Sequence, residues 1–521
     1  MRITNRMVNH GALKNMQRSQ ASVGDTTTTL TTGKKIQKAS EDPVIAMRAL
    51  KLRTTVDQLA QFKDKNIKDA DSWMMVTENS LHNVVDRLND VYNYCVQGAN
   101  DTFETDDKQS IADSLQALKG MIYSEGSATY AGRYIYSGFR TGTDLTFATN
   151  ADVKVISSYD INQKLTSDDF QQINTVTKPF NYDKVDDYLS GAATYEPPRD
   201  SSAYIQKLAY ENIDYAKKTE TDPGTGETKE VPDAANTAAP TFDGKDLATL
   251  GFTYVVKGPE DKDSYYDVAD DEVAFIPETG ELVYGKDAYN TLKESKEISM
   301  DYTKSEFKVG DLRPDHYFNC TKHEIQSDGT IKDIQFEQPD EGQKLQYEVN
   351  FSQFITVNTE GRDAITHDMG NKIDQLSRAL TELDNIETTI AKLNSLKNDP
   401  NYKDDEDALK QIDQYLKDAD VEMALKRENV TKLFEHGETW FTDFANMVGA
   451  LQADVGTRMN KLDMIANRVS EQYNNFDELK SANEDKETEE AIIEFNEAQV
   501  TYNASLAATS NILKTTLLDY L

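Results

Sequence analysis

The 521-residue sequence is short of several features, and each shortage excludes a class of protein. Its two cysteines, Cys95 and Cys320, are too few for the disulfide framework of a small secreted domain. It has no run of about 18 apolar residues, so we expect no membrane insertion. Residues 1–10 lack the apolar core and the cleavage site of a secretory signal peptide, which leaves a cytoplasmic protein or one exported without cleavage.

Basic residues are also scarce. Lysine and arginine number 56 against 91 aspartates and glutamates, which gives a formal net charge of −35 and argues against nucleic acid as a partner. The hydrophobic fraction of 38% is below the level of about 45–50% in globular domains. Long thin helices with a narrow buried stripe would explain this low hydrophobic fraction. Disorder would explain it too, but the 26 tyrosines and 19 phenylalanines are more than a disordered chain usually carries.

Signatures of catalysis and metal binding are missing as well. The six histidines do not cluster in the sequence. His323 and Glu324 begin like a zinc-protease helix motif, but position 327 holds serine where a second histidine is needed. No Gly-x-Ser-x-Gly elbow occurs either. We therefore expect no catalytic residues, no metal and no cofactor.

What the sequence does contain is helical periodicity at both ends. A first seam with steps of three and four residues comprises Leu13, Met16, Gln20, Val23, Thr27 and Leu30. It predicts a helix that ends at Gly33, and Asp42 with Pro43 predicts the start of the next one. That second seam runs from Ile45 to Leu59 and, after a one-residue offset, from Ile67 to Cys95. Cys95 is therefore expected to be a core residue.

The C-terminal part carries longer seams. One runs without a break from Phe444 to Leu479, and turn-rich residues 398–405 precede its helix. A last seam comprises Ile492, Phe495, Gln499, Tyr502, Leu506, Thr509, Leu513, Thr516 and Tyr520. The helical patterns at the two chain ends indicate a helical rod whose halves come from opposite ends of the chain.

The middle of the chain has a different pattern. Short β-rich runs at Phe252–Val256, Val273–Ile276 and Tyr347–Phe351 are bounded by turn signals, and the aromatic, glycine-rich stretch Tyr134–Phe147 suggests a hairpin. The predicted fold class is thus mainly α at both termini, with long antiparallel helices in a coiled-coil-like rod and one or more inserted β-rich domains. A chain of this length is also too long for a single core.

Five segments carry a family resemblance. They are LTTGKKIQKASEDP at 30–43, WMMVTENSL at 73–81, GRYIYSGFRTGTDLTF at 132–147, VGTRMNKLD at 455–463 and ASLAATSNILKTTLLDYL at 504–521. Together and in this order they resemble the flagellin-like family, and in particular its hook-associated members at the hook–filament junction. The resemblance covers about the first 147 and the last 160 residues.

The resemblance implies a division of the chain and a set of assembly residues. Residues 1–40 and 482–521 would be terminal assembly helices, 41–145 and 361–481 the two halves of a helical rod, and 146–360 an outer β-rich insert. The implied assembly seams contain Leu13, Met16, Val23, Leu30, Tyr502, Leu506, Leu513, Leu517, Leu518 and Leu521.

The resemblance also implies a function. The chain would be a non-enzymatic structural subunit of the extracellular bacterial flagellum, joining hook to filament and exported unfolded by the flagellar type III route. Its partners would be the first hook-associated protein, flagellin, further copies of itself in a ring, and an export chaperone. A flagellin-type filament subunit, an enzyme displayed in the insert and a cytosolic coiled-coil scaffold are the alternatives.

Overall fold

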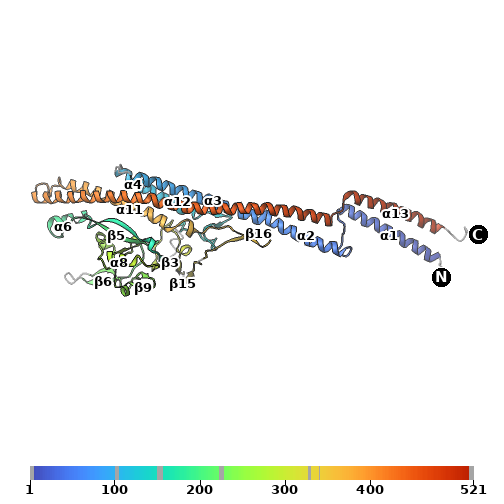
Figure 1. The fold of residues 1–521 in the computed structure, drawn as a ribbon, viewed down its shortest axis with the longest axis horizontal. Coiled ribbons are helices and arrows are strands. Elements are labelled where there is room, and N and C mark those ends of the chain that lie inside the picture. The colour runs from blue at the N-terminus through green and yellow to red at the C-terminus, as the bar shows by residue number, and fades with distance from the viewer. Residues whose placement is uncertain are drawn as a thin grey trace, which may run out of the picture. The chain divides into compact units, whose positions relative to one another are not determined.

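A computed structural model describes residues 5–99, 105–149, 157–221, 228–326, 330–339 and 341–514. The long helices come from the two ends of the chain and the strands come from its middle, as the colours of Figure 1 show. This arrangement confirms the predicted fold class, mainly α at both ends with a β-rich insert.

Two boundaries of the N-terminal helices, the end of the first and the start of the second, fall where the sequence predicts. They are α1 (Asn5–Thr32), α2 (Pro43–Gln61), α3 (Ile67–Ala99) and α4 (Thr105–Glu125). At the end of α1, Gly33 has a φ of 68° and its N–H donates to the Thr29 carbonyl at 2.8 Å. The Asp42 side chain caps α2 by accepting hydrogen bonds from two backbone N–H groups of the first turn.

A π-helical turn, η1 (Phe62–Asn66), separates α2 from α3. The backbone N–H of Ile67 donates to the carbonyl of Phe62, five residues back instead of four. The buried stripe therefore steps by five residues from Phe62 to Ile67, which accounts for the one-residue offset between the two predicted seams. A strand hairpin packs on this turn, with the Phe62 and Phe351 rings edge-to-face at 5.4 Å and Asn66 donating to the Glu348 carbonyl at 2.7 Å.

The C-terminal helices are α11 (His367–Leu396), α12 (Glu406–Glu484) and α13 (Thr488–Lys514). The break between α11 and α12 falls in the predicted turn-rich segment. Of the predicted C-terminal seam, Val448, Val455, Leu462, Ile465 and Val469 are buried, whereas Leu479 at its predicted end is 55% exposed.

Two larger sheets occupy the middle of the chain. The six-stranded sheet has the order β15 (Ile331–Phe336), β14 (Asn319–Ile325), β3 (Ser157–Leu165), β13 (Ile298–Lys304), β8 (Thr241–Phe242) and β9 (Lys245–Asp246). The five-stranded sheet has the order β10 (Thr253–Val256), β11 (Glu272–Ile276), β12 (Glu281–Tyr284), β5 (Arg199–Lys207) and β4 (Gln171–Thr177). Strands β10 and β11 pair in parallel, and the other neighbours in these sheets are antiparallel.

The remaining elements are short. The two-stranded pairs are β1 (Thr129–Tyr130) with β2 (Arg133–Tyr134), β6 (Lys217–Thr221) with β7 (Thr228–Pro232), and β16 (Gln346–Asn350) with β17 (Gln353–Thr356). The short helices are α6 (Val185–Ser190), α7 (Leu247–Leu250), α8 (Lys286–Leu292), α9 (Pro314–Tyr317) and α10 (Gly361–Ala364), and 3₁₀ turns lie at Ser167–Asp169, Tyr182–Lys184 and Pro259–Ser264. All three predicted β-rich runs fall on strands, namely β10, β11 and β16.

The hairpin predicted over Tyr134–Phe147 is wrong in position. The strands that pair are β1 and β2, joined by Ala131 and Gly132, both with positive φ. Beyond Tyr134 the backbone makes successive turns, including hydrogen bonds from Arg140 N–H to the Ser137 carbonyl and from Thr143 N–H to the Arg140 carbonyl. Tyr134 N–H also donates to the Thr141 carbonyl at 2.8 Å, but residues 135–147 form no strand, so the glycine-rich stretch follows the hairpin instead of making it.

The chain forms two compact units. Unit 1 comprises Met1–Asp71, Tyr347–Ile355 and Met459–Leu521, and unit 2 comprises Ser72–Gln346 and Thr356–Arg458. Within unit 2, α4 packs on α11, with Lys119 and Asp374 paired at 2.5 Å, and the two sheets share a core that includes Phe242, Phe275 and Tyr159. Cys95 is fully buried and lies so close to α12 that a Cβ on Gly437 would sit 2.7 Å from its sulfur. The expected core role of Cys95 is confirmed.

Candidate assembly site: the terminal helix pair and its junction

In unit 1, α1 and α13 form an antiparallel pair, the terminal helix pair. An isolated β-bridge joins Lys34 and Asp485 next to the end of α1 and the start of α13. Toward the other end, the Thr509 hydroxyl reaches the Ala12 carbonyl at 3.5 Å. Segments almost 500 residues apart in sequence therefore run side by side (Figure 1).

Small residues alternate with larger ones in the contact between these two helices. On α1 the inward, half-buried positions are Asn9, Ala12, Met16, Ser19, Val23, Thr26 and Leu30. On α13 the corresponding half-buried or buried positions are Ala491, Phe495, Ala498, Tyr502, Ser505 and Thr509. Both sets keep alternating steps of three and four residues, as a paired helix face requires. Small side chains let two helices approach closely but bury little apolar area, so the pair is weakly stabilised.

The structure brings together part of the predicted assembly seam. Met16, Val23, Leu30 and Tyr502 lie on the contact, whereas Leu13 and Leu506 lie beside it with 40% and 46% of their surface exposed. The backbone of Leu513 is in α13, and its side chain lies outside the described residues, as do Leu517, Leu518 and Leu521. The role of all these residues in assembly stays a prediction.

Sequence reasoning missed the small half of the seam. It selected Leu13 and Leu506 because they are large and apolar, but the inward positions one residue earlier are Ala12 and Ser505. A search for alanine and serine at the same spacing would have found the contact face.

The threonine hydroxyls near the end of α1 form hydrogen bonds within the helix itself. The side chains of Thr26, Thr27, Thr28, Thr29, Thr31 and Thr32 each donate to the carbonyl four residues earlier, at 2.6–3.1 Å. These β-branched residues have low helix propensity, and the pairing with α13 compensates for that weakness.

The junction consists of residues 33–42, which lead from α1 to α2, and residues 485–487, which lead from α12 to α13. Backbone hydrogen bonds tie the two connections together, from Lys35 N–H to the Glu484 carbonyl and from Lys486 N–H to the Gly33 carbonyl, both at 2.8 Å. The junction thus works as a two-stranded clasp at the base of the terminal helix pair.

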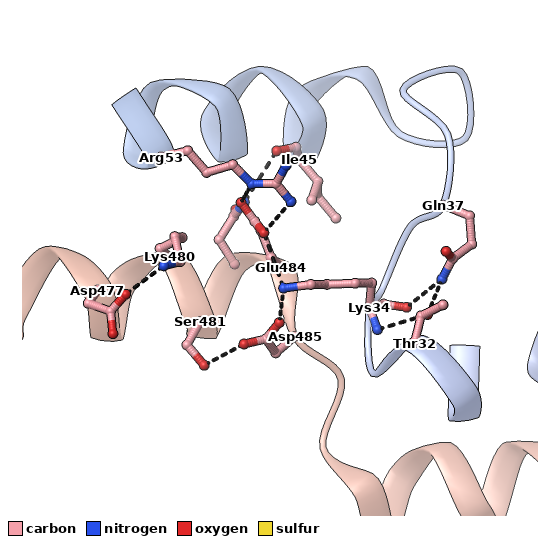
Figure 2. Close-up of polar contacts among 11 residues, drawn as sticks. Thr32, Lys34, Gln37, Ile45, Arg53, Asp477, Lys480, Ser481, Glu484 and Asp485 are labelled. Atoms are coloured by element: carbon pink, nitrogen blue, oxygen red, sulfur yellow. Dashed lines mark hydrogen bonds and ion pairs between the residues drawn. The ribbon is translucent and has the colours of Figure 1, made fainter. Parts of the chain in front are cut away.

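A buried carboxylate organises the junction. Figure 2 shows Glu484 between Arg53 and Lys34, with Arg53 Nε and Nη2 each donating to one carboxylate oxygen at 2.6 Å and Lys34 Nζ at 3.3 Å. The Glu484 side chain is only 5% exposed, and the hydrogen bonds from Arg53 lower the pKa of its carboxyl. A bidentate arginine fixes the direction of the carboxylate as well as its charge.

Neighbouring side chains extend this cluster. Lys34 also pairs with Asp485, whose other oxygen accepts a hydrogen bond from Ser481 at 2.8 Å (Figure 2). The hydrogen bond from Lys34 lowers the pKa of Asp485, and Asp485 in turn raises the pKa of Lys34. The side chain of Asn483 donates to the Ile45 carbonyl at 3.2 Å, so α2, α12 and both connections meet at one point.

The described part of the chain offers little for other kinds of site. None of its helices is long and apolar enough to cross a membrane. Within the same residues, no group of three or more histidine, cysteine, aspartate or glutamate side chains is placed to hold a metal ion.

Both ends of the chain match protein-family models. Residues 3–141 match the bacterial flagellin N-terminal helical region, and residues 440–521 match the bacterial flagellin C-terminal helical region. Both ends of the chain are flagellin-like. The two matched regions supply α1 and α13, so the terminal helix pair joins one flagellin-like end to the other.

Two curated relatives have the same printed name. The chain is 26% identical over 144 residues to the flagellar hook-associated protein 3 of Escherichia coli K12, which covers 27% of this chain and 45% of the relative. It is 27% identical over 142 residues to the protein of that name from Salmonella typhimurium LT2, which covers 27% and 44%. The chain thus spans less than half the length of the curated relatives that it matches.

Solved structures of similar proteins include a flagellar hook-associated protein from Vibrio parahaemolyticus, with a TM-score of 0.34 and 12% identity, covering 85% of this chain and all of the other. Hook-associated protein 3 from Legionella pneumophila has a TM-score of 0.29 and 12% identity, covering 83% and 96%.

Proposed function

We propose that the chain is a structural subunit of the bacterial flagellum that connects the hook to the flagellin filament. One observation carries the proposal: two flagellin-like ends from opposite termini pair as helices in one unit, through a weak seam and with apolar side chains still exposed. A weak pair with uncovered apolar surface is suited to completion by neighbouring subunits.

The printed name of the curated relatives supports a place at the junction rather than along the filament. The segments at 132–147 and 504–521 resemble hook-associated proteins in the same way. A flagellin-type filament subunit is the second candidate, because both family models describe flagellin helical regions.

The finer parts of the proposal concern export and partners. The subunit would travel unfolded through the flagellar export channel with a chaperone, reach the cell exterior, and bind the first hook-associated protein, flagellin and further copies of itself. Residues 1–40 and 482–521 would be the assembly segments, 41–145 and 361–481 the rod, and 146–360 the outer insert. We propose no catalytic activity and no cofactor.

The experiment is deletion of the gene. Cells that lack this subunit should build hooks, export flagellin and release it into the medium, and the intact gene should restore filaments. Filaments of normal number in the deletion strain would contradict the proposal. Loss of flagellin itself from the medium would favour the filament-subunit alternative, and absence of the chain from sheared flagella would favour a cytosolic scaffold.

A further inference from the structure

An apolar stripe runs along the outer side of α2. Val44, Met47 and Leu50 are 63%, 72% and 63% exposed and follow one another at steps of three residues, as along a helix ridge. Exposed basic side chains at Arg48 and Lys51 flank the stripe. Among the described residues, neither of these two side chains forms an ion pair. We call these five residues the α2 face.

A second stripe of opposite charge lies on α13. Ile493 and Val500 are 56% and 67% exposed on the side away from the seam with α1, and Ile492, which is 44% exposed, lies between them and the seam. The exposed carboxylates of Glu489 and Glu497 accompany them, and within the described part of the chain neither is paired with a lysine, arginine or histidine. We call these five residues the α13 face.

The two faces match in composition and in charge. Each presents three large apolar side chains with two unpaired charges, basic on α2 and acidic on α13. The surrounding sequence has the same bias, since basic residues outnumber acidic ones from residue 34 to 53 and acidic residues outnumber basic ones from 471 to 497. Both faces are exposed in the single chain, so neither covers the other there.

We propose that the α2 face of one copy docks on the α13 face of a second copy of this chain. The proposal rests on the proposed function and names the contact through which its subunits associate. Because the two faces differ, the contact is heterologous, and it continues from copy to copy as a ring or helical array instead of closing as a dimer. The apolar stripes would supply affinity and the charges would supply register.

Charge reversal tests the pairing. In cells that lack the native gene, Arg48→Glu with Lys51→Glu should lower the amount of chain in sheared flagella, relative to the amount exported, by about tenfold, because four like charges then face each other. Glu489→Lys with Glu497→Lys should have the same effect. Lys65→Glu with Lys403→Glu, the same charge change at exposed positions elsewhere, should leave incorporation unchanged.

Rescue identifies the partner. A chain with all four reversals, or co-expression of the two double variants, should restore incorporation, since each reversed face again meets an opposite charge. A defect in the α2 variant that neither combination rescues would overturn the proposal and indicate a different acidic partner. Normal incorporation of both double variants would overturn it too, while the presence of the wild-type chain in the flagella would leave the proposed function intact.

Cross-linking provides an independent measurement. Cys95 and Cys320 are buried, so new surface thiols are free to pair with each other. Oxidised flagella carrying Met47→Cys with Ile493→Cys should give a ladder of covalent multimers, whereas Met47→Cys with Met121→Cys should not. A single dimer band, or no cross-link at all in flagella that contain the chain, would contradict the heterologous contact. A wild-type chain missing from flagella would overturn both the contact and the proposed function.

Discussion

Two helix faces with the same periodicity, on α3 and on α1, differ in how far they are buried. Within unit 2 the seam of α3 is completely buried, with Met74, Thr77, Leu81, Val84, Leu88, Val91 and Cys95 all at 0% exposure. In unit 1 the seam of α1 is at best half-buried and has small residues at every second position. Both seams step by three and four residues, so spacing predicts a helix but not how well its face is covered.

The difference in burial indicates that the α3 seam stabilises the folded chain, whereas the terminal helix pair leaves surface for assembly. A seam of large, fully buried side chains stabilises a unit by itself, because each such side chain contributes about 1.5–3 kcal/mol on burial. The seam between α1 and α13 contributes less, because alanine, serine and threonine alternate in it with larger side chains that are only half-buried, and the large side chains on the outside of α1 and α13 remain available. Substitutions in the α3 seam should therefore destabilise the monomer, whereas those on the terminal helix pair should act on assembly.

The largest effect is expected for Leu88→Ala in the α3 seam. Removing a fully buried leucine should lower the free energy of unfolding of unit 2 by about 2–5 kcal/mol. Both tryptophans, Trp73 and Trp440, belong to unit 2, so urea unfolding followed by tryptophan fluorescence measures it. Leu13→Ala on α1 is the matched control and should leave that transition unchanged. Equal effects of the two substitutions would remove the distinction between the seams.

The next effect is a loss of stability in acid caused by His367, the first residue of α11 in unit 2. The rings of Tyr210, Tyr317 and Phe318 surround it at centroid distances of 4.8, 4.5 and 5.3 Å, and burial lowers its pKa to about 3. The unfolded state binds the proton more readily, so stability falls as the pH drops below the ordinary histidine pKa of about 6.5. At about pH 5 this amounts to about 2 kcal/mol relative to neutral pH.

The substitution His367→Phe should remove that part of the acid sensitivity while keeping the aromatic packing. Tryptophan-detected urea unfolding at pH 7 and at pH 5 gives the difference for the wild type and the variant. An identical loss of stability in both proteins would show that His367 is not the group responsible.

A smaller effect is expected at the junction in unit 1. Glu484→Gln retains the shape of the side chain but loses its charge, which should weaken the clasp by about 1 kcal/mol at neutral pH. Amide hydrogen exchange in α1 and α13 should therefore become about fivefold faster. Because its bonds to Arg53 depress the pKa of Glu484, the charge contributes stability above the ordinary glutamate pKa of about 4.3 and loses it as the pH falls through the lower folded value.

The pH dependence supplies the control for that substitution. The difference between wild type and Glu484→Gln should shrink in acid below about pH 4.3, where the wild-type carboxyl also becomes protonated. A difference that stays constant with pH would assign the effect to packing instead of charge.

The sequence predicted the helices well because their signals are local. Gly33 and the Asp42–Pro43 pair each determine a helix end through contacts within a few residues. The hairpin was misplaced because Ala131 and Gly132 form its turn, and an alanine with positive φ has no sequence signature. The Arg53–Glu484 pair joins positions 431 residues apart, which no local pattern reports.

The smallest monomer effect, and the sharpest test of the comparison, is expected for Leu506→Asp on α13. Leu506 lies beside the seam with 46% of its surface exposed, so the monomer should change by no more than about 0.5 kcal/mol. If neighbouring subunits cover this position, the carboxylate loses water without a partner, which costs several kcal/mol per contact and should abolish incorporation into flagella. Hydrogen exchange of α13 in the monomer and the amount of chain in sheared flagella measure the two effects separately.

A neutral variant separates charge from shape at the same position. Leu506→Asn has nearly the size of the aspartate without its charge, so it should incorporate poorly but measurably, between the wild type and Leu506→Asp. Faster exchange throughout α13 in the aspartate monomer would place Leu506 in the intrachain contact, and the distinction between folding and assembly seams would then fail at this residue. Normal flagella built from the Leu506→Asp chain would remove Leu506 from the predicted assembly seam, because no interface that excludes water tolerates a row of unpaired carboxylates.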